Sequence, residues 1–243
     1  MFTTINYSPN FDLKKRKNKD IKFIVFHYTG MKYEKQAIRK LIDFNSKVSS
    51  HYLIKNNGEI LHLVPDLYTA WHAGISNWKK IKSLNKNSIG IEISNSGHNF
   101  KYKKFSKKQI FAIIKLSRFL KKKYNIKVKN FLGHSDIAPD RKIDPGEKFP
   151  WKYLSKKKIG YWHNLNNQKL LKERCVNTSN FEKNKFIKNL YIIGYAKINK
   201  RGKKKNFKIL SSAFQRRYRQ ELINGIIDQE CLSISENLLK KLK

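Results

Sequence analysis

The chain has 243 residues, 40% of them hydrophobic and 13% aromatic, which is enough for one large domain or for a large domain with a small partner. No apolar run approaches the roughly 20 residues that cross a bilayer, and two cysteines exclude both a disulfide framework and a four-cysteine zinc site. The net charge of +37 favours a polyanionic partner, but it is spread along the chain and consists mostly of lysine, so compositional drift is the alternative explanation.

The first part of the chain predicts a strand, a helix and a hairpin. Residues 21–29 form a short β-branched and aromatic run that is typical of a buried strand, and His27 lies near its end. Residues 33–48 place apolar side chains at helical spacing. Two alternating runs, residues 51–55 and 59–64, flank the sequence Asn-Asn-Gly, which favours a β-hairpin.

The elements that follow complete a predicted sheet. Residues 88–94 predict a second buried strand, and residues 106–124 predict a helix that opens with a capping box. A last short strand is expected at residues 128–132, before a long proline-containing loop at residues 133–150. Strands interleaved with helices predict an α/β (α+β) fold, with a central mixed β-sheet flanked by helices.

The composition divides the chain into two domains. We expect one domain at residues 1–162, a polar linker with a turn of helix at residues 163–180, and a small three-helix domain at residues 181–243. The three helices are expected at residues 181–196, 211–223 and 235–242, with a lysine-rich loop at residues 197–208.

His27, His134 and Asp144 are candidate metal ligands. Each histidine lies where a predicted strand meets a loop, and Asp144 follows His134 by ten residues in the sequence GHSDIAPDRKIDPG. Two imidazoles and one carboxylate form a zinc-type ligand set that leaves a fourth position for water. The alternative, a loop histidine bonded to the backbone, is the interpretation that His134 by itself favours, and spacing alone does not reverse it because His27 and Asp144 are far apart in the sequence.

Glu92 and Lys142 are candidate catalytic residues. A carboxylate in an isoleucine-rich strand is costly to bury unless it is paired or functional. An edge strand with Glu92 facing solvent is the alternative. Lys142, two residues before Asp144, would lie beside a metal held there and could stabilise an oxyanion.

Five segments of the chain resemble, in order, the type 2 N-acetylmuramoyl-L-alanine amidases, which share their fold with phage lysozyme-type amidases and peptidoglycan recognition proteins. They are FHYTG, SSHYLIKNNGEI, AWHAGISNW, NSIGIEISN and GHSDIAPDRKIDPG, between about residues 20 and 155. The resemblance implies one zinc ion per chain, held by His27, His134 and Asp144. It also implies hydrolysis of the amide between N-acetylmuramic acid and L-alanine, in peptidoglycan or muropeptides, during cell-wall turnover or recycling.

The same resemblance implies roles for further residues. Glu92 would be the general base and Lys142 the oxyanion partner, while Trp71 and His72 would line the substrate groove. Phage members carry a tyrosine just before the strand that begins His-Tyr, whereas this chain has Ser50 there. The subgroup with glutamate in the second strand also lacks that tyrosine, which supports Glu92 as the base.

A weaker resemblance covers the C-terminal part. The sequences SAFQRRY and NGIID, followed by a short helix, are similar to helical peptidoglycan-binding domains. A generic three-helix domain is the alternative.

We therefore expect a zinc amidase that acts on peptidoglycan or muropeptides as a monomer without a membrane span. The alternatives are a non-catalytic peptidoglycan-binding protein of the same fold and, from the charge alone, a basic nucleic-acid-binding protein, which the resemblance disfavours. Residues 1–6 lack the basic and apolar segments of a secretory signal, which favours the cytoplasm. The resemblance to wall-binding domains favours the alternative, the periplasm or cell envelope.

Overall fold

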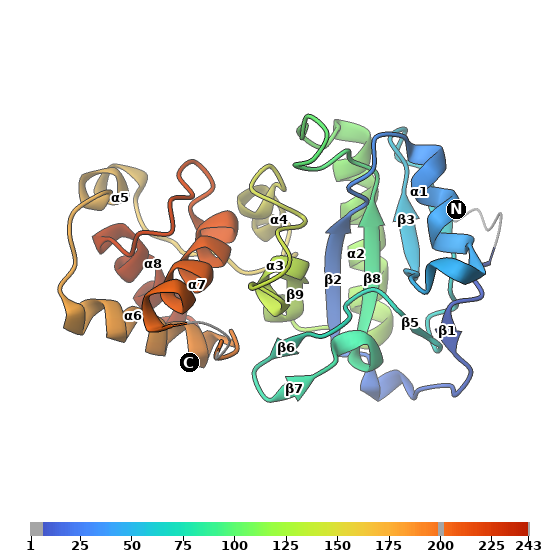
Figure 1. The fold of residues 1–243 in the computed structure, drawn as a ribbon, viewed down its shortest axis with the longest axis horizontal. Helices are drawn as coiled ribbons and strands as arrows, with labels where there is room; N and C mark the ends of the chain where they lie inside the picture. The colour runs from blue at the N-terminus through green and yellow to red at the C-terminus, as the bar shows by residue number, and fades with distance from the viewer. Residues whose placement is uncertain (1–6, 199–201, 243) are drawn as a thin grey trace.

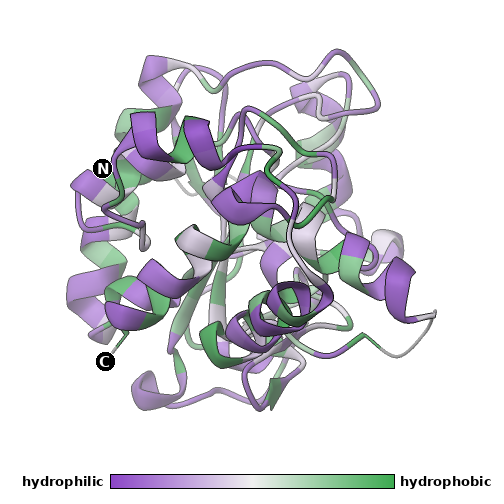
Figure 2. Ribbon diagram, turned by 90° about the vertical axis from the view of Figure 1, so that its left-hand side faces the viewer, coloured by the Kyte–Doolittle hydropathy of each residue, from purple (hydrophilic) through white to green (hydrophobic). Residues whose placement is uncertain are grey.

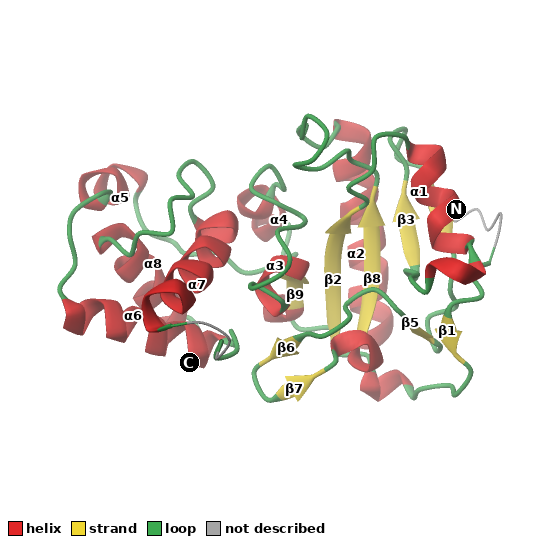
Figure 3. Ribbon diagram, viewed as in Figure 1, coloured by secondary structure: helices red, strands yellow, loops and turns green. Residues whose placement is uncertain are grey.

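The computed structural model describes residues 7–198 and 202–242, and its centre is a five-stranded sheet (Figures 1 and 3). Its strands are β2 (Phe23–Tyr28), β3 (Tyr52–Ile54), β4 (Ile60–His62), β8 (Ser88–Ile93) and β9 (Phe131–Gly133). The strand order is β4-β3-β8-β2-β9. The pair β3–β4 is antiparallel and the other neighbours are parallel. The predicted mixed sheet is therefore confirmed, and β3 and β4 form the predicted hairpin.

Two minor sheets lie outside this central one. They pair β1 (Phe11–Asp12) with β5 (Thr69–Ala70), and β6 (Asn77–Trp78) with β7 (Ile81–Lys82). The sequence did not predict these strands, because two residues are too few to display an alternating pattern.

The described residues also form eight α-helices. They are α1 (Glu34–Ile42), α2 (Lys107–Tyr124), α3 (His134–Ile137), α4 (Trp151–Lys156), α5 (Asn167–Glu173), α6 (Asn180–Ile193), α7 (Lys203–Tyr218) and α8 (Gln229–Lys240). Short 3-10 turns occur at Asn18–Asp20, Phe44–Ser46, Leu84–Asn87 and Val128–Asn130. Within the ranges that the structure describes, no helix has the length and apolarity needed to cross a membrane.

The two long strands alternate between a packed face and a face that carries polar groups. Ile24 and Phe26 of β2 pack in one core with Ile91 of β8 and with the buried side of α2. Because successive side chains of a strand point to opposite faces, His27 and Glu92 lie on the other face, where they are register partners. In Figure 2 the hydrophobic colour runs along the inner strands, and the hydrophilic colour covers much of the outer helices.

Several predicted elements differ from the structure in extent. The helix expected at residues 33–48 ends at Ile42. The backbone of Asp43 is extended rather than helical, and its carboxylate accepts a hydrogen bond from the Asn45 N–H. The strand expected at residues 128–132 begins only at Phe131, after a 3-10 turn.

The expected loop 133–150 contains α3. Its first turn is stabilised because the Asp136 carboxylate accepts a hydrogen bond from the Gly133 N–H at 2.8 Å.

The C-terminal helices were predicted in the right number but with wrong limits. Helix α7 begins at Lys203, eight residues before the expected start, and ends at Tyr218; the buried side chain of Leu210 belongs to its packed face. Helix α8 begins at Gln229 instead of residue 235, because the Asp228 side chain caps it by accepting from the Cys231 N–H. Residues 199–201 of the expected loop 197–208 lie outside the described ranges, as do residues 1–6.

Helices α6, α7 and α8 lie beyond the β9 edge of the sheet, with α3 and α4 between (Figure 1). They do not pack separately from the sheet. Leu132 of β9 and Ile137 of α3 share one hydrophobic core with Phe186 of α6 and Phe214 of α7. This continuous core fixes the C-terminal helices against the part of the molecule that carries His134.

Candidate metal centre and active site

Three parallel strands bring candidate residues together at their carboxyl ends. His27 is near the end of β2, Glu92 lies opposite it near the end of β8, and His134 directly follows β9. The carboxyl ends of parallel strands lie at the same end of the sheet, and sheets of this kind bind ligands at that end. A cavity of about 330 Å³ opens there. All seven predicted site residues line it, namely His27, Trp71, His72, Glu92, His134, Lys142 and Asp144.

His27, His134 and Asp144 converge on one point. The two Nδ1 atoms are 2.9 Å apart, and Oδ2 of Asp144 lies 3.1 Å from each of them. All three residues are buried. His27 and His134 are 107 residues apart in the sequence, and Asp144 follows His134 by 10. The fold thus brings one candidate ligand atom from each of the three residues to a single site.

Hydrogen bonds around His27 show which of its nitrogens is free. The Ser88 hydroxyl donates to the Leu84 carbonyl at 2.6 Å, so its oxygen accepts from Nε2–H of His72 at 3.1 Å. Nδ1 of His72 is then an acceptor, and it receives Nε2–H of His27 at 3.0 Å. A neutral imidazole carries one proton, so Nδ1 of His27 presents a lone pair to the site.

A similar contact selects the tautomer of His134. Its Nε2 lies 3.2 Å from the carbonyl of Ala73, which can only accept, so Nε2 carries the proton and Nδ1 is free. Burial, followed by the neighbouring imidazole of His134, lowers the pKa of His27 to about 4, so His27 is neutral at pH 7.

Three acceptor atoms therefore face one another with no proton between them. Two imidazole lone pairs and a carboxylate repel at distances near 3 Å unless a cation lies among them. Nitrogen and carboxylate ligands together suit a borderline metal ion. This donor set fits the predicted metal site.

Glu92 is a half-buried acid beside this centre. Its Oε2 has no hydrogen-bond partner among the described residues, and the side chain lines the cavity. Burial, followed by the negative charge of Asp144, raises its pKa to about 8, while Lys142 and Lys40 act in the opposite direction. The alternative in which Glu92 lies on an edge strand facing bulk solvent is wrong, because β8 is paired on both sides.

Lys142 and Trp71 both line the cavity. The Lys142 N–H donates to the carbonyl of Ala138 at 3.0 Å, and this bond fixes the backbone of Lys142 in the loop that carries Asp144. The indole N–H of Trp71 donates to Asp12 at 2.8 Å, so the ring is fixed where it lines the cavity. Both residues are half-buried, as side chains that contact a ligand should be.

Sequence reasoning missed the residues that support the ligands. It placed His72 in the substrate groove; in the structure both ring nitrogens of His72 are engaged, by His27 and by Ser88. Arg141 donates to the carbonyl of Ala73 at 2.6 Å, the same carbonyl that His134 contacts. These contacts join residues that are distant in sequence, so no local pattern indicated them.

His51 is structural. Its Nδ1 accepts the Gly90 N–H at 3.0 Å, which fixes β8 near Glu92. Burial, followed by the positive charge of Arg16, lowers the pKa of His51 to about 3.

Comparison with known proteins gives consistent matches. A family model described as N-acetylmuramoyl-L-alanine amidase matches residues 17–147. The N-acetylmuramoyl-L-alanine amidase AmiD of Escherichia coli (strain K12) is 37% identical over 234 residues, which are 91% of this chain and 83% of AmiD.

Two solved structures are similar over nearly the whole chain. The complex of E. coli AmiD with anhydro-N-acetylmuramic acid-L-Ala-D-γ-Glu-L-Lys superposes with a TM-score of 0.80 at 34% identity, covering 95% of this chain and 93% of that one. AmpDH3 of Pseudomonas aeruginosa in complex with anhydromuramic pentapeptide also gives a TM-score of 0.80, at 30% identity and with 98% of each chain covered.

Proposed function

This chain belongs to the N-acetylmuramoyl-L-alanine amidase family, and on that premise we propose how its own residues hydrolyse the amide between N-acetylmuramic acid and L-alanine. The observation that carries the proposal is the convergence of two free imidazole nitrogens and a carboxylate beside Glu92, a half-buried acid whose Oε2 has no hydrogen-bond partner among the described residues. A nearby carboxylate that can take up a proton is what hydrolysis of an amide by water requires.

We propose that His27, His134 and Asp144 hold one Zn²⁺ per chain. Two neutral imidazoles and one carboxylate are a common ligand set of catalytic zinc. When bound there, Zn²⁺ would supply Lewis-acid polarisation of the amide carbonyl and of a water molecule. His72 and the Ala73 carbonyl would keep the two imidazoles in the tautomers that this site needs.

Glu92 is proposed as the general base and Lys142 as the residue that stabilises the oxyanion. The raised pKa of Glu92 suits a group that accepts a proton from the attacking water and returns it to the leaving nitrogen of L-alanine. Lys142 lines the same cavity as Glu92, and its positive charge lowers the pKa of Glu92. An ammonium group there would oppose the negative charge that develops on the carbonyl oxygen.

The substrate proposed is a muropeptide that carries an anhydro-muramic end. Both solved complexes described above contain such a ligand, and each covers more than nine tenths of this chain. Trp71 and His72 are the residues proposed to line the groove for it. Polymeric peptidoglycan is the alternative, and comparing product release from purified sacculi and from anhydro-muropeptides at equal L-alanine content distinguishes the two.

We also propose the division into an amidase domain at residues 1–162, a linker at 163–180 and a peptidoglycan-binding-like domain at 181–243. Two residues of the AFQ sequence that suggested the binding domain, Phe214 and Gln215, are fully buried. Gln215 donates to the Ile226 carbonyl and accepts the Gly225 N–H, so it holds the turn after α7. Any contact with the wall would therefore come from other side chains of these helices.

The protein is proposed to act as a monomer in the cytoplasm, with the periplasm or cell envelope as the alternative compartment. Sedimentation equilibrium tests the first statement. Cell fractionation with detection of the protein in each fraction tests the second.

Metal content and activity measured on one preparation test the proposed function. We expect about one zinc per chain, and release of peptides with an L-alanine N-terminus that stops on chelation and returns with zinc. Glu92→Gln should keep the zinc and lose the release. Zinc bound without any release by the wild type, or activity that survives complete removal of metal, would contradict the proposal.

A further inference from the structure

Asp136 is a buried carboxylate that joins the metal centre to the C-terminal helices. It lies in α3, two residues after His134, and its Oδ2 accepts the Gly133 N–H at 2.8 Å. This bond closes the first turn of α3 and so fixes the backbone from which His134 projects. In the same turn, the Ser135 N–H donates to the carbonyl of Asp144 at 2.8 Å. One helical turn therefore supports two of the three ligand residues.

Two side chains from the C-terminal helices reach this carboxylate. Arg217 of α7 forms an ion pair and hydrogen bond with Oδ2 of Asp136, and the Tyr195 hydroxyl, just after α6, donates to Oδ1 at 2.9 Å. The second Nη of Arg217 donates to the carbonyl of Phe131 in β9 at 2.9 Å. Its guanidinium lies 4.1 Å from the ring centroid of Trp151. The Arg217 side chain thus bridges α7, β9 and α3.

The pair is shielded from water, which makes each partner depend on the other. The side chains of Arg217 and Asp136 are 3% and 1% exposed. A buried carboxylate without its cation must protonate, admit water or move, because an unpaired buried charge is strongly unfavourable. Each of these changes alters the bond between Asp136 and Gly133 and thereby the turn that presents His134.

We propose that Arg217 and Tyr195 are positioning residues for the metal centre, acting through Asp136. They hold α3 so that the imidazole of His134 meets its two fellow ligands. The inference rests on the metal site proposed above. It also makes the C-terminal helices a support of the active site, whatever they bind on their outer surface.

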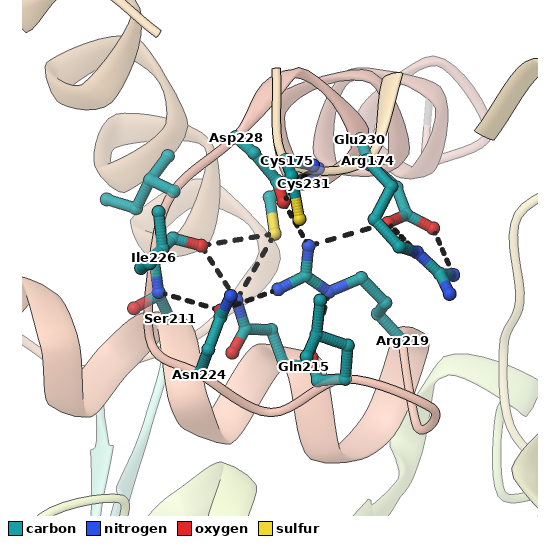
Figure 4. A network of polar contacts seen from close by, with 12 residues as sticks. Arg174, Cys175, Ser211, Gln215, Arg219, Asn224, Ile226, Asp228, Glu230 and Cys231 are labelled. Atoms are coloured by element: carbon teal, nitrogen blue, oxygen red, sulfur yellow. Dashed lines mark hydrogen bonds and ion pairs between the residues drawn. The ribbon is translucent and has the colours of Figure 1, made fainter. Parts of the chain in front are cut away.

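Arg219 provides a matched control. It lies two residues after Arg217, and its side chain is fully buried against Asp228 and Glu230 (Figure 4). It also donates to Asn224 at 2.9 Å, so the side-chain partners shown for it belong to the C-terminal helices and their turns. Loss of Arg219 leaves buried acids unpaired, as loss of Arg217 does, but none of the side-chain contacts that the structure describes for Arg219 reaches α3 or His134.

The test compares metal affinity in full-length Arg217→Met and Arg219→Met proteins. Zn²⁺ affinity is measured by competition with a chelating dye, the site geometry by the visible spectrum of the Co²⁺-loaded protein, and folding by circular dichroism. For Arg217→Met we expect zinc to bind at least about tenfold more weakly, with an altered Co²⁺ spectrum, because groups that orient metal ligands have effects of this size. For Arg219→Met we expect a lowered unfolding midpoint with wild-type zinc affinity in the folded protein.

The possible outcomes distinguish failure of this inference from failure of the proposed metal site. Failure of the wild type to bind zinc contradicts the site. Zinc binding by the wild type with unchanged affinity and spectrum in Arg217→Met overturns the inference, as does an equal loss in Arg219→Met.

If Arg217→Met does not fold, two milder variants test the inference in its place. Tyr195→Phe should weaken zinc binding by about fivefold, the equivalent of one hydrogen bond. The double variant Arg217→Met/Asp136→Asn removes both charges but keeps an acceptor for Gly133, and it should fold and bind zinc. Wild-type zinc affinity in Tyr195→Phe overturns the inference.

Discussion

Nε2 of His27 lies 3.0 Å from Nδ1 of His72, and this contact decides which nitrogen of His27 faces the proposed metal site. His72 is 8% exposed, and its other nitrogen is held by the Ser88 hydroxyl. A chain of hydrogen bonds that starts at the carbonyl of Leu84 thus ends at a free imidazole lone pair in the cavity.

Removal of the imidazole at residue 72 should weaken metal binding. In His72→Leu, His27 loses the acceptor that fixes its tautomer and ring orientation, so we expect Zn²⁺ affinity to fall about 10- to 100-fold. Competition with a chelating dye measures the effect. His163→Leu is the control, since His163 is also 8% exposed but lines a different cavity. Equal affinities in His72→Leu and wild type would show that the contact has no part in tautomer selection.

Glu92→Gln should separate chemistry from binding. The substitution keeps the shape of the side chain but removes the group that takes the proton from water, so kcat should fall by about 10²- to 10⁴-fold. Zinc content and KM should change little. The measurement is single-turnover release of the L-alanine peptide at saturating substrate, and a kcat within threefold of the wild type would remove Glu92 from the role of base.

Gly90→Ala, a substitution in β8, should displace His72 and so weaken the proposed metal site. A Cβ at Gly90 would lie 2.4 Å from Cγ of His72, closer than side chains approach, so His72 or β8 must shift. We expect a loss of about 1–3 kcal/mol in unfolding free energy, as in other overpacked cores, together with weaker zinc binding.

Gly202→Ala is the matched control for this substitution, because nothing lies within 4 Å of its added Cβ. Urea unfolding of both variants checks the expectation. An equally small effect in the two proteins would contradict the close approach of Gly90 and His72.

Zinc should raise the melting temperature only when the ligands are intact. A ligand that binds the folded state alone stabilises it by about 2.7 kcal/mol at a free concentration of 100 times its Kd. We therefore expect a clear rise in Tm for the wild type after addition of zinc to metal-free protein, and none for His134→Ala. Differential scanning fluorimetry measures both, and an equal rise in both proteins would indicate zinc bound elsewhere.

Acid should destabilise the metal-free protein, in part through His51. The folded pKa of about 3 lies below the unfolded value of about 6.5, so the unfolded state binds the proton first. The stability that His51 contributes is complete above pH 6.5 and is lost as the pH falls from 6.5 toward 3, by up to about 1.4 kcal/mol per pH unit.

His51→Asn tests this dependence, because the amide oxygen can still accept the Gly90 N–H but does not titrate. Urea unfolding at pH 7, 6, 5 and 4 in the presence of chelator should show a shallower pH dependence for the variant. Parallel curves for the two proteins would mean that His51 is not the group responsible.

The sequence alone determined the sheet and the chemical groups of the site. The apolar runs at residues 21–29 and 88–94 placed His27 and Glu92 in predicted strands, and the segment around His134 and Asp144 carried the resemblance that implied the set of metal ligands. These features are local, because a strand's periodicity and a short motif are complete within a few residues. The limits of the helices were less well predicted, since α7 and α8 are set by a cap and by packing against other helices.

Only the tertiary structure decided how the ligands are held. His27 and His72 are 45 residues apart, and Asp136 and Arg217 are 81 apart, so neither contact leaves a pattern along the chain. The tautomers of His27 and His134 follow from the acceptors that the fold brings beside their Nε2 atoms, which are Nδ1 of His72 and the carbonyl of Ala73. A hydrogen bond acts over about 3 Å, and the packing of strands and helices, not sequence distance, sets which groups come that close.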